Sequence, residues 1–278
     1  PVAHSFPTRR SSDLMTDQAG LPVLQTTWRE AVSETEAVSS YEVLGDFSGS
    51  GLDNWQSVGK AFGQQTTLGA PVFNKNATQL SRLSEGKASS RQMNTGVVGA
   101  LRSPNFTITK DFLGIRALGK NASIRIIIDN FQLIQNPIYG ELEMRVDRES
   151  WQNYSVDVSP WKGHTAYIEV IPGYFQRHHY QLPEDAYVEV AYALAYQDAW
   201  PEQPLPQNVS ESSLPQSVRR WVNGQAGAAD IRLINQSIQK KPLKNLSAEI
   251  QQLHQQEQQR ARQFRDTAFF VGITEGFG

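Results

Sequence analysis

The stretch Ser123-Ile-Arg-Ile-Ile-Ile-Asp129 decides the fold. Alternate positions of this stretch hold Ile124, Ile126 and Ile128, and the positions between and after them include Arg125 and Asp129. Successive side chains of a β-strand point to opposite faces, so these isoleucines would meet a core on one side only. β-branched residues also suit a pleated strand. The stretch therefore predicts a strand with one face on a hydrophobic core.

The segment Ala186–Gln197 repeats this alternation nearer the C-terminus. A regular period of two gives each of its faces a distinct set of residues. The predicted apolar face holds Val188, Val190, Tyr192 and Leu194, and Glu189, Ala191 and Ala193 lie opposite.

Between these two stretches and on either side, short segments of period two are separated by Gly, Pro, Asn and Asp. No helical period intervenes, which favours antiparallel pairing over β–α–β units. The predicted strands are Tyr41–Phe47, Trp55–Phe62, Val97–Arg102, Asn105–Thr109, Leu113–Leu118, Ser123–Asp129, Glu141–Val146, Gln152–Val158, Thr165–Ile171 and Ala186–Gln197. The predicted fold is mainly β, with an antiparallel β-sandwich over residues 41–200.

Helical patterns flank the predicted sandwich. Residues 15–40 read as a helical lead-in, in which Thr27 and Glu30 form a capping box. Residues 201–213 are rich in proline and serine, which is typical of a linker. Residues 214–278 form an α-helical segment, because their apolar residues recur at helical spacing. The expected helices are Pro215–Val222, Ala228–Lys240 and Ser247–Ala268, the last with an apolar stripe of Ile250, Leu253, Ala261 and Phe264.

The first residues do not resemble a protein segment. His4–Leu14 matches the translation of a common sequencing adapter. We expect residues 1–14 to be an artefact that has no place in the fold. We also expect the chain to be an internal fragment, truncated at its C-terminal end.

Composition argues against several classes of function. The net charge of −2 gives no electrostatic reason to expect nucleic acid or an anionic membrane as partner. No apolar run approaches the roughly 18 residues of a membrane span. The absence of cysteine excludes disulfides, thiolate catalysis, cysteine zinc sites and Cys-x-x-Cys-His haem attachment.

The sequence contains no recognisable catalytic motif, and we predict no catalytic residue. A nucleophile elbow, a P-loop, a dinucleotide-binding loop and a helical zinc motif are all missing from the sequence. A pair of carboxylates for glycosidic cleavage meets in space rather than along the chain, so a hydrolase with unrecognised carboxylates stays an alternative.

Two segments have the composition of a ligand site. In the first, Asp129–Gly140, Asn130, Gln132 and Tyr139 are the candidates. Amides read sugar hydroxyls, and an aromatic ring stacks on the apolar face of a sugar. The alternative is that the apolar residues of this segment belong to the core and Asn136-Pro137 sets a turn.

The second segment is the loop Gly173–Pro183, which contains three aromatic residues. Its candidate ligand-binding residues are Tyr174, Arg177, His178 and His179. Long loops on a rigid sandwich often carry binding sites. The alternative is a lid folded over a sheet edge or against a neighbouring domain.

A structural Ca²⁺ is the one cofactor considered for this fragment. Asp46 and Glu189, with Ser48 and Asp53, supply the oxygen ligands that this ion prefers. The alternative is that these side chains have ordinary turn and capping roles.

Taken in order, several motifs resemble a known family. They are Gly51-Leu-Asp-Asn-Trp55, Gly59-Lys-Ala-Phe-Gly63, Gly99-Ala-Leu-Arg-Ser-Pro-Asn-Phe-Thr-Ile108, Ile127-Ile-Asp-Asn-Phe-Gln-Leu-Ile134, Pro137-Ile-Tyr-Gly140 and Val156-Asp-Val-Ser-Pro-Trp-Lys-Gly-His-Thr-Ala-Tyr-Ile-Glu169. The set resembles the β-sandwich insert of planctomycete-type cytochrome-c-associated multidomain proteins. The helical tail resembles the lead-in to their C-terminal domain of unknown function. The last motif is also similar to jelly-roll modules of secreted glycoside hydrolases.

The resemblance implies a jelly-roll-like (galactose-binding-like) sandwich in an exported bacterial protein, whether periplasmic, cell-surface or extracellular. It places haem only in a missing upstream domain and suggests a role in polysaccharide use. The loop Tyr174–Pro183 is longer than in the hydrolase modules. We therefore carry no ligand or metal site over from them.

These observations leave three hypotheses. The leading one is a non-catalytic carbohydrate-binding or targeting module with a polysaccharide as partner. The alternative is a scaffold that positions neighbouring domains of the same chain, a haem domain and a C-terminal domain. The hydrolase is the third.

Overall fold

The computed structural model describes residues 40–74, 78–131, 142–176, 179–202, 204–205, 212–241, 243–244 and 248–266. The expected artefact and the expected helix of the lead-in lie outside these residues. All strands and helices given below belong to one compact unit that begins at Tyr41. No helix in the described ranges is long and apolar enough to cross a membrane.

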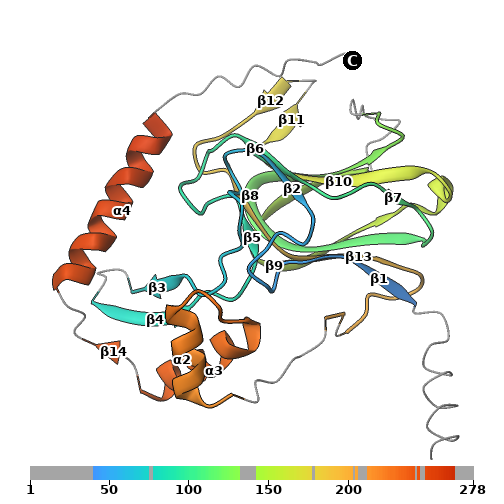
Figure 1. Ribbon diagram of the computed structural model, residues 1–278. Helices are drawn as coiled ribbons and strands as arrows, with labels where there is room; N and C mark the ends of the chain where they lie inside the picture. The colour runs from blue at the N-terminus through green and yellow to red at the C-terminus, as the bar shows by residue number, and fades with distance from the viewer. Residues whose placement is uncertain are drawn as a thin grey trace, which may run out of the picture. The chain divides into compact units, whose positions relative to one another are not determined.

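A nine-stranded antiparallel sheet is the largest of the sheets in the described residues (Figure 1). Its path is β1 (Tyr41–Asp46), β13 (Tyr187–Tyr196), β8 (Phe112–Ile128), β10 (Thr165–Pro172), β6 (Gly99–Arg102) and β2 (Gln56–Gly59). Off this path, β9 (Glu143–Asp157) pairs with β8, β5 (Ala88–Ser89) with β13, and β7 (Phe106–Thr107) with β10. The predicted mainly β, antiparallel sandwich is confirmed.

Two long strands, β8 and β9, replace four short strands of the sequence prediction. β8 pairs with β13 along its first half and with β10 along its second, while β9 pairs with it from Phe112 to Arg125. Its pairing with β9 shifts between Ala117 and Ala122, around Gly119 and Asn121, which has a φ of 49°. A Cβ on Gly119 would lie 2.4 Å from the carbonyl oxygen of Tyr187. The supposed break is therefore a bend within one strand, and the sheet curls so that β8 and β9 serve both layers.

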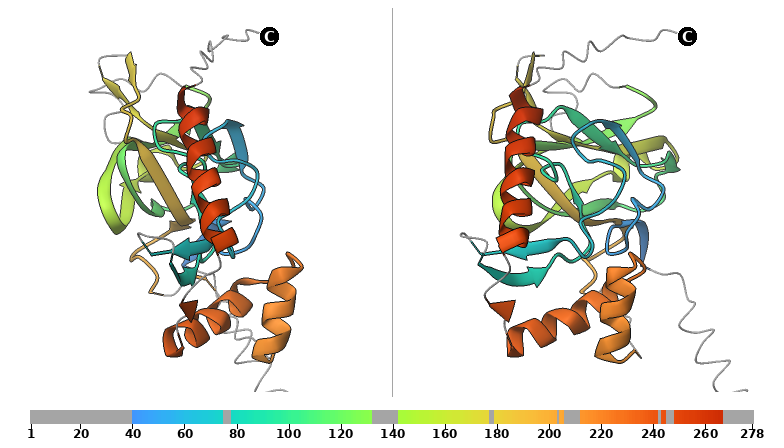
Figure 2. Two further views of the ribbon diagram at one scale, coloured as in Figure 1. Left: turned by 90° about the vertical axis from the view of Figure 1, so that its left-hand side faces the viewer. Right: turned by 60° about the vertical axis from the view of Figure 1, so that its left-hand side comes forward.

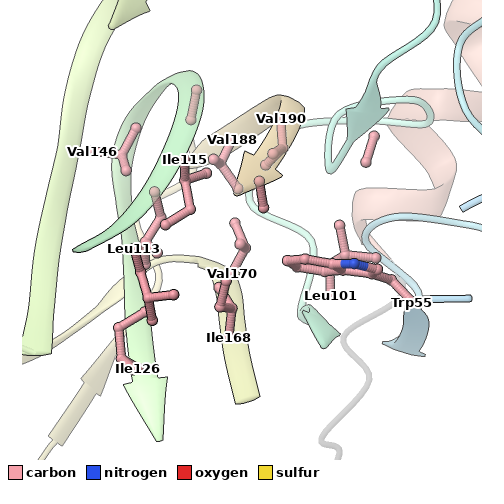
Figure 3. Packing of buried hydrophobic residues seen from close by; sticks show 14 of the residues in the cluster. Trp55, Leu101, Leu113, Ile115, Ile126, Val146, Ile168, Val170, Val188 and Val190 are labelled. Carbon is pink, nitrogen blue, oxygen red and sulfur yellow. The ribbon is translucent and has the colours of Figure 1, made fainter. Parts of the chain in front are cut away.

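The main core lies between these layers. Figure 3 shows side chains of β8, β10 and β13 directed toward one another around Ile115, Val170 and Val188. Ile124, Ile126 and Ile128 all belong to this core, as predicted. Arg125, on the opposite face of β8, is also buried, with 7% of its surface exposed.

The predicted face of β13 is correct only in its first half. Val188 and Val190 belong to the core, but the next core residues are Ala193 and Ala195. The pairing with β8 shifts between Val190 and Tyr192, because one residue is inserted there. An inserted residue exchanges the two faces of the strand beyond it. Tyr192 and Leu194 therefore point away from the core, contrary to prediction.

A second, smaller core joins a distant part of the chain to the helices. The strands β3 (Pro71–Phe73), β4 (Gln79–Leu83) and β14 (Leu243–Lys244) form a three-stranded sheet beside α3 (Figure 2). Leu80 and Leu83 pack there with Ile231, Ile234 and Ile238. No strand was predicted for residues 63–96, so β3 and β4 are a correction.

The helices are close to the predicted ones. They are α2 (Leu214–Val222), α3 (Ala228–Lys240) and α4 (Ala248–Asp266). The Asn235 amide of α3 accepts a hydrogen bond from the Leu83 N–H at 2.7 Å and donates one to the Leu83 carbonyl at 2.9 Å. Trp221 of α2 donates from its indole nitrogen to the Gly69 carbonyl at 2.8 Å. Specific polar contacts thus fix both helices to residues 69–83.

Candidate functional site

A hollow of about 260 Å³ opens where β8, β10 and β7 meet at their ends. We call it the strand-end hollow. β8 ends at Ile128, opposite Ala166 of β10, and β7 pairs with the start of β10. The lining residues are Asn105, Asp129, Asn130, Thr165, Ala166 and Tyr167. Each lies on a strand or within two residues of a strand end, so the sheet fixes its position.

The wall formed by Asp129 and Asn130 has an unusual backbone. Their φ angles are 50° and 62°, in the left-handed region. Asp and Asn enter this region more readily than other residues that carry a Cβ, which accounts for the pair at this turn. The amide of Asn130 is exposed beside the hollow. The turn thus presents a polar side chain from a fixed backbone.

The Asp129 carboxylate is held by two partners. One oxygen lies 2.6 Å from His164 Nδ1, and the other accepts a hydrogen bond from the Thr165 N–H at 3.3 Å. The hydrogen bond with His164 is the main cause that lowers the pKa of Asp129 from its ordinary value. The carboxylate is therefore ionised at neutral pH, with part of its hydrogen-bonding capacity directed at the protein.

This Asp–His pair does not extend to a catalytic triad within the described residues. A triad needs a serine, threonine or cysteine hydrogen-bonded to the second nitrogen of the histidine. His164 is exposed, and in the described part of the chain its ring is bonded only to Asp129. The pair lies at the rim of the hollow, and among the described residues no serine, threonine or cysteine is hydrogen-bonded to the second nitrogen of His164.

Three charged residues join the neighbouring strands on the outer face of the sheet. Glu169 of β10 lies opposite Arg102 of β6 and Arg125 of β8. Its carboxylate is 2.6 Å from Arg102 Nε and 2.9 Å from an Arg125 guanidinium nitrogen. Arg102 also lies 5.8 Å from the ring centre of Tyr167, which lines the hollow. The network fixes the strands that carry the hollow.

The predicted residues of the first segment fall partly at this hollow. Asn130 lines it. Gln132 and Tyr139 lie outside the described residues. Phe131 is described and 64% exposed, directly after Asn130. The ligand role of these residues stays a prediction.

The second predicted segment is a hairpin rather than an open loop. β11 (Tyr174–Gln176) pairs with β12 (His179–Gln181), and Arg177 and His178 lie outside the described residues. The Phe175 ring covers Arg125 at 4.6 Å, and the Tyr180 hydroxyl donates to the Pro172 carbonyl.

The candidate residues Tyr174 and His179 belong to this hairpin. Tyr174 packs against the Arg145 guanidinium at 3.3 Å, while His179 is exposed opposite Gln176. The hairpin thus covers part of the sheet, as the lid alternative describes, and the ligand roles of Tyr174 and His179 stay predictions.

The two proposed cation ligands are engaged within the chain. Asp46 accepts a hydrogen bond from the Ser48 N–H at 2.8 Å, and its own N–H donates to Asp53 at 2.7 Å. Glu189 is buried between Lys87 at 2.6 Å and Arg91 at 2.9 Å. Across the described ranges, no three His, Asp or Glu side chains gather as a metal site. A cation at Asp46 and Glu189 therefore stays a prediction from sequence.

Asn130 is the one lining residue of the hollow that was predicted from the sequence to bind a ligand. Asn105, Thr165 and Tyr167 were not predicted as ligand-binding residues, although all three line it. Asn105 and Asn130 come together only because β7 and β8 both pair with β10. No local signal reports such a meeting.

Comparison with known proteins gives structural likeness alone. No family model matches the sequence, and no curated protein matches it either. Solved structures with a similar arrangement include a family two carbohydrate esterase from Cellvibrio japonicus, at 15% identity and a TM-score of 0.28. The match covers 60% of this chain and 36% of the esterase.

Two further similar structures are an adhesin domain and a carbohydrate-binding module. The K3 cleaved adhesin domain of Lys-gingipain from Porphyromonas gingivalis is 11% identical, with a TM-score of 0.33 and 55% of this chain and 97% of that one covered. A family 29 carbohydrate-binding module from Piromyces equi is 8% identical, with a TM-score of 0.32 and coverages of 56% and 88%. At these values the likeness carries no conclusion about what this chain binds.

Proposed function

We propose that the sandwich is a non-catalytic carbohydrate-binding module of a larger exported protein, and that the strand-end hollow binds a sugar. The observation that carries the proposal is the set of groups around one hollow on rigid strand ends. Asn105 and Asn130 provide amides and Thr165 a hydroxyl, and Tyr167, which is buried with 7% exposed, forms part of the wall. Amides and hydroxyls both donate and accept, as sugar hydroxyls require. Export is inferred from the family resemblance.

The charges at the hollow favour a neutral or weakly basic sugar. Asp129 is ionised, and its partner His164 lies at the rim. Arg102, which lies 5.8 Å from the ring centre of Tyr167, is already paired with Glu169. An anionic sugar would be repelled by the Asp129 carboxylate.

The test uses the whole chain and a panel of soluble neutral polysaccharides in affinity gels, followed by calorimetry with the best ligand. Asn130→Gly removes the amide but keeps a residue that tolerates a positive φ. We expect it to weaken binding about three- to tenfold, because a hydrogen bond contributes about 0.5–1.5 kcal/mol net. Asn105→Ala should act similarly. Gln64→Ala, an exposed amide outside the hollow, is the matched control. Failure of the unaltered chain to bind any neutral polysaccharide would refute the proposal.

One observation favours the scaffold alternative. Leu214, Val218 and Val222 follow at intervals of four along α2, and they are 36%, 37% and 71% exposed. Such a stripe on a helix is suited to docking against another domain. Under this alternative, Val222→Glu should leave this chain equally stable but weaken its contact with a neighbouring domain in the longer protein. Equal docking of both forms would count against it.

A further inference from the structure

A group of aromatic side chains lies where β13 pairs with the first half of β8, on the face that points away from the main core. The strand-end hollow lies at the other end of β8. The residue inserted in β13 turns Tyr192 and Tyr196 outward. Tyr196 lies opposite Phe112 of β8, and the two rings stack at 5.3 Å with an angle of 22°. The sequence pattern had assigned Tyr192 to the core face.

Trp200 returns from beyond the end of β13 and completes this group. Its ring centre lies 6.2 Å from that of Tyr192 and 5.6 Å from that of Tyr196. The ring rests directly on the backbone of Gly114, where an added Cβ would be only 2.5 Å from it. We call Phe112, Tyr192, Tyr196 and Trp200 the aromatic platform.

The platform is partly open to solvent. Tyr196 is buried, with 5% exposed, and forms its base. Phe112, Tyr192 and Trp200 are each only half-buried. None of the four belongs to the main hydrophobic core, so filling the core does not explain them.

Hydrogen-bonding side chains border the platform along β8 and β9. Arg116, opposite Tyr192 in the register, donates to the exposed Asn153 side chain at 2.7 Å. Ser155 lies 2.5 Å from the Tyr196 hydroxyl. The border also holds Asp157, whose pKa is lowered by its hydrogen bond to Ser159. Arg116 and Asp157 carry charges of opposite sign on this border.

From this combination we infer that the aromatic platform is a second saccharide-binding surface, which takes a single neutral oligosaccharide chain. Aromatic faces receive the apolar face of a pyranose ring, while the amide and guanidinium groups read its hydroxyls. The Trp200 ring is tilted by 46° to Tyr192 and by 64° to Tyr196. Such a surface suits successive sugar rings that are turned relative to one another, not the flat face of a crystalline polysaccharide. The inference rests on the proposed carbohydrate-binding function.

The competing explanation is that Trp200 only anchors the chain that leaves β13. Both roles would be served by the same contacts with Gly114 and Tyr196. The two roles predict different results when an exposed residue beside the platform is changed. Asn153 tests this difference, because it is exposed on β9 and its side chain is hydrogen-bonded to Arg116, which is not one of the four platform residues.

The test measures binding of soluble cello-, manno-, xylo- and laminari-hexasaccharides to the whole chain by calorimetry and by tryptophan fluorescence. We expect Trp200→Leu to weaken binding at least about tenfold, and Asn153→Ala about threefold. Gln152→Ala is the matched control, because this exposed neighbour on β9 points to the other side of the strand. Thermal unfolding of each variant checks the fold. If Trp200→Leu fails to fold, Asn153→Ala decides.

The outcomes separate the two proposals. If Trp200→Leu and Asn153→Ala both bind as the unaltered chain does while Asn130→Gly binds less, the platform is only packing and the proposed function stands. If the unaltered chain binds none of the sugars, both proposals fail. Retention on crystalline cellulose would overturn the preference for a single chain.

Discussion

Asn235 is the most informative single residue for testing how the helices are joined to the strands. Its side chain is buried, with 7% exposed, and it satisfies both the N–H and the carbonyl of Leu83. Asn235→Ala would remove two hydrogen bonds and leave two buried backbone groups without these partners. A net hydrogen bond is worth about 0.5–1.5 kcal/mol, and an unsatisfied buried group costs about 1–3 kcal/mol. We therefore expect a loss of about 2–4 kcal/mol in the free energy of unfolding.

Urea unfolding followed by circular dichroism measures this loss. With an m-value of about 2–3 kcal/mol per molar, the midpoint should fall by roughly 1 M at unchanged m. Amide hydrogen exchange at Leu83 should accelerate in the variant, because its bond to the Asn235 oxygen is gone. Gln236→Ala, an exposed neighbour on the same helix, should change neither quantity. A change below about 0.5 kcal/mol for Asn235→Ala, with Leu83 exchange unaltered, would refute the described junction.

Three further predictions concern packing and charge. Gly114→Ala should displace Trp200 and cost about 1–3 kcal/mol, seen as a lower melting temperature and a shifted tryptophan emission; an unshifted emission would contradict it. Glu169→Ala should cost about 3–5 kcal/mol in urea unfolding, because it leaves the buried Arg125 without its carboxylate, and an unchanged midpoint would count against that network. Burial alone would raise the pKa of Asp230, but hydrogen bonds from Ser217, Arg220 and the Gly227 N–H lower it to about 2. Its stabilising effect is therefore present above about pH 4 and lost as the pH falls toward 2. The lowered pKa corresponds to about 2 kcal/mol, which Asp230→Asn should abolish in acid unfolding.

The sandwich could be predicted because its strands alternate. Ile124, Ile126 and Ile128 entered the core as the period of two requires. The alternation of core and outer residues along β13 is interrupted at Ala191. The single inserted residue there exchanges the two faces of the strand beyond it. Nothing in the residues around Ala191 distinguishes an insertion from regular alternation, because the bulge exists only relative to the partner strand.

The second core could not be predicted because its halves are far apart in the sequence. Leu83 and Asn235 are separated by 152 residues. β3 and β4 are too short to show a period by themselves. Asn130 was predicted as a ligand-binding residue from local composition. Asn105, which lines the same hollow, was not. Composition reports the chemistry of a segment, whereas only the sheet determines which segments meet.

Residues 68–83 and 221–238 together form the second core. This dependence limits how the protein can vary through evolution. Neither segment can bury Leu83 or Ile231 without the other. A gene rearrangement that moved the sandwich without the helices would leave Leu80 and Leu83 facing water. Relatives that lack α2 and α3 should therefore carry polar residues, or a deletion, at the positions of β3 and β4. The two segments are expected to be inherited together although the whole of β8 to β13 lies between them.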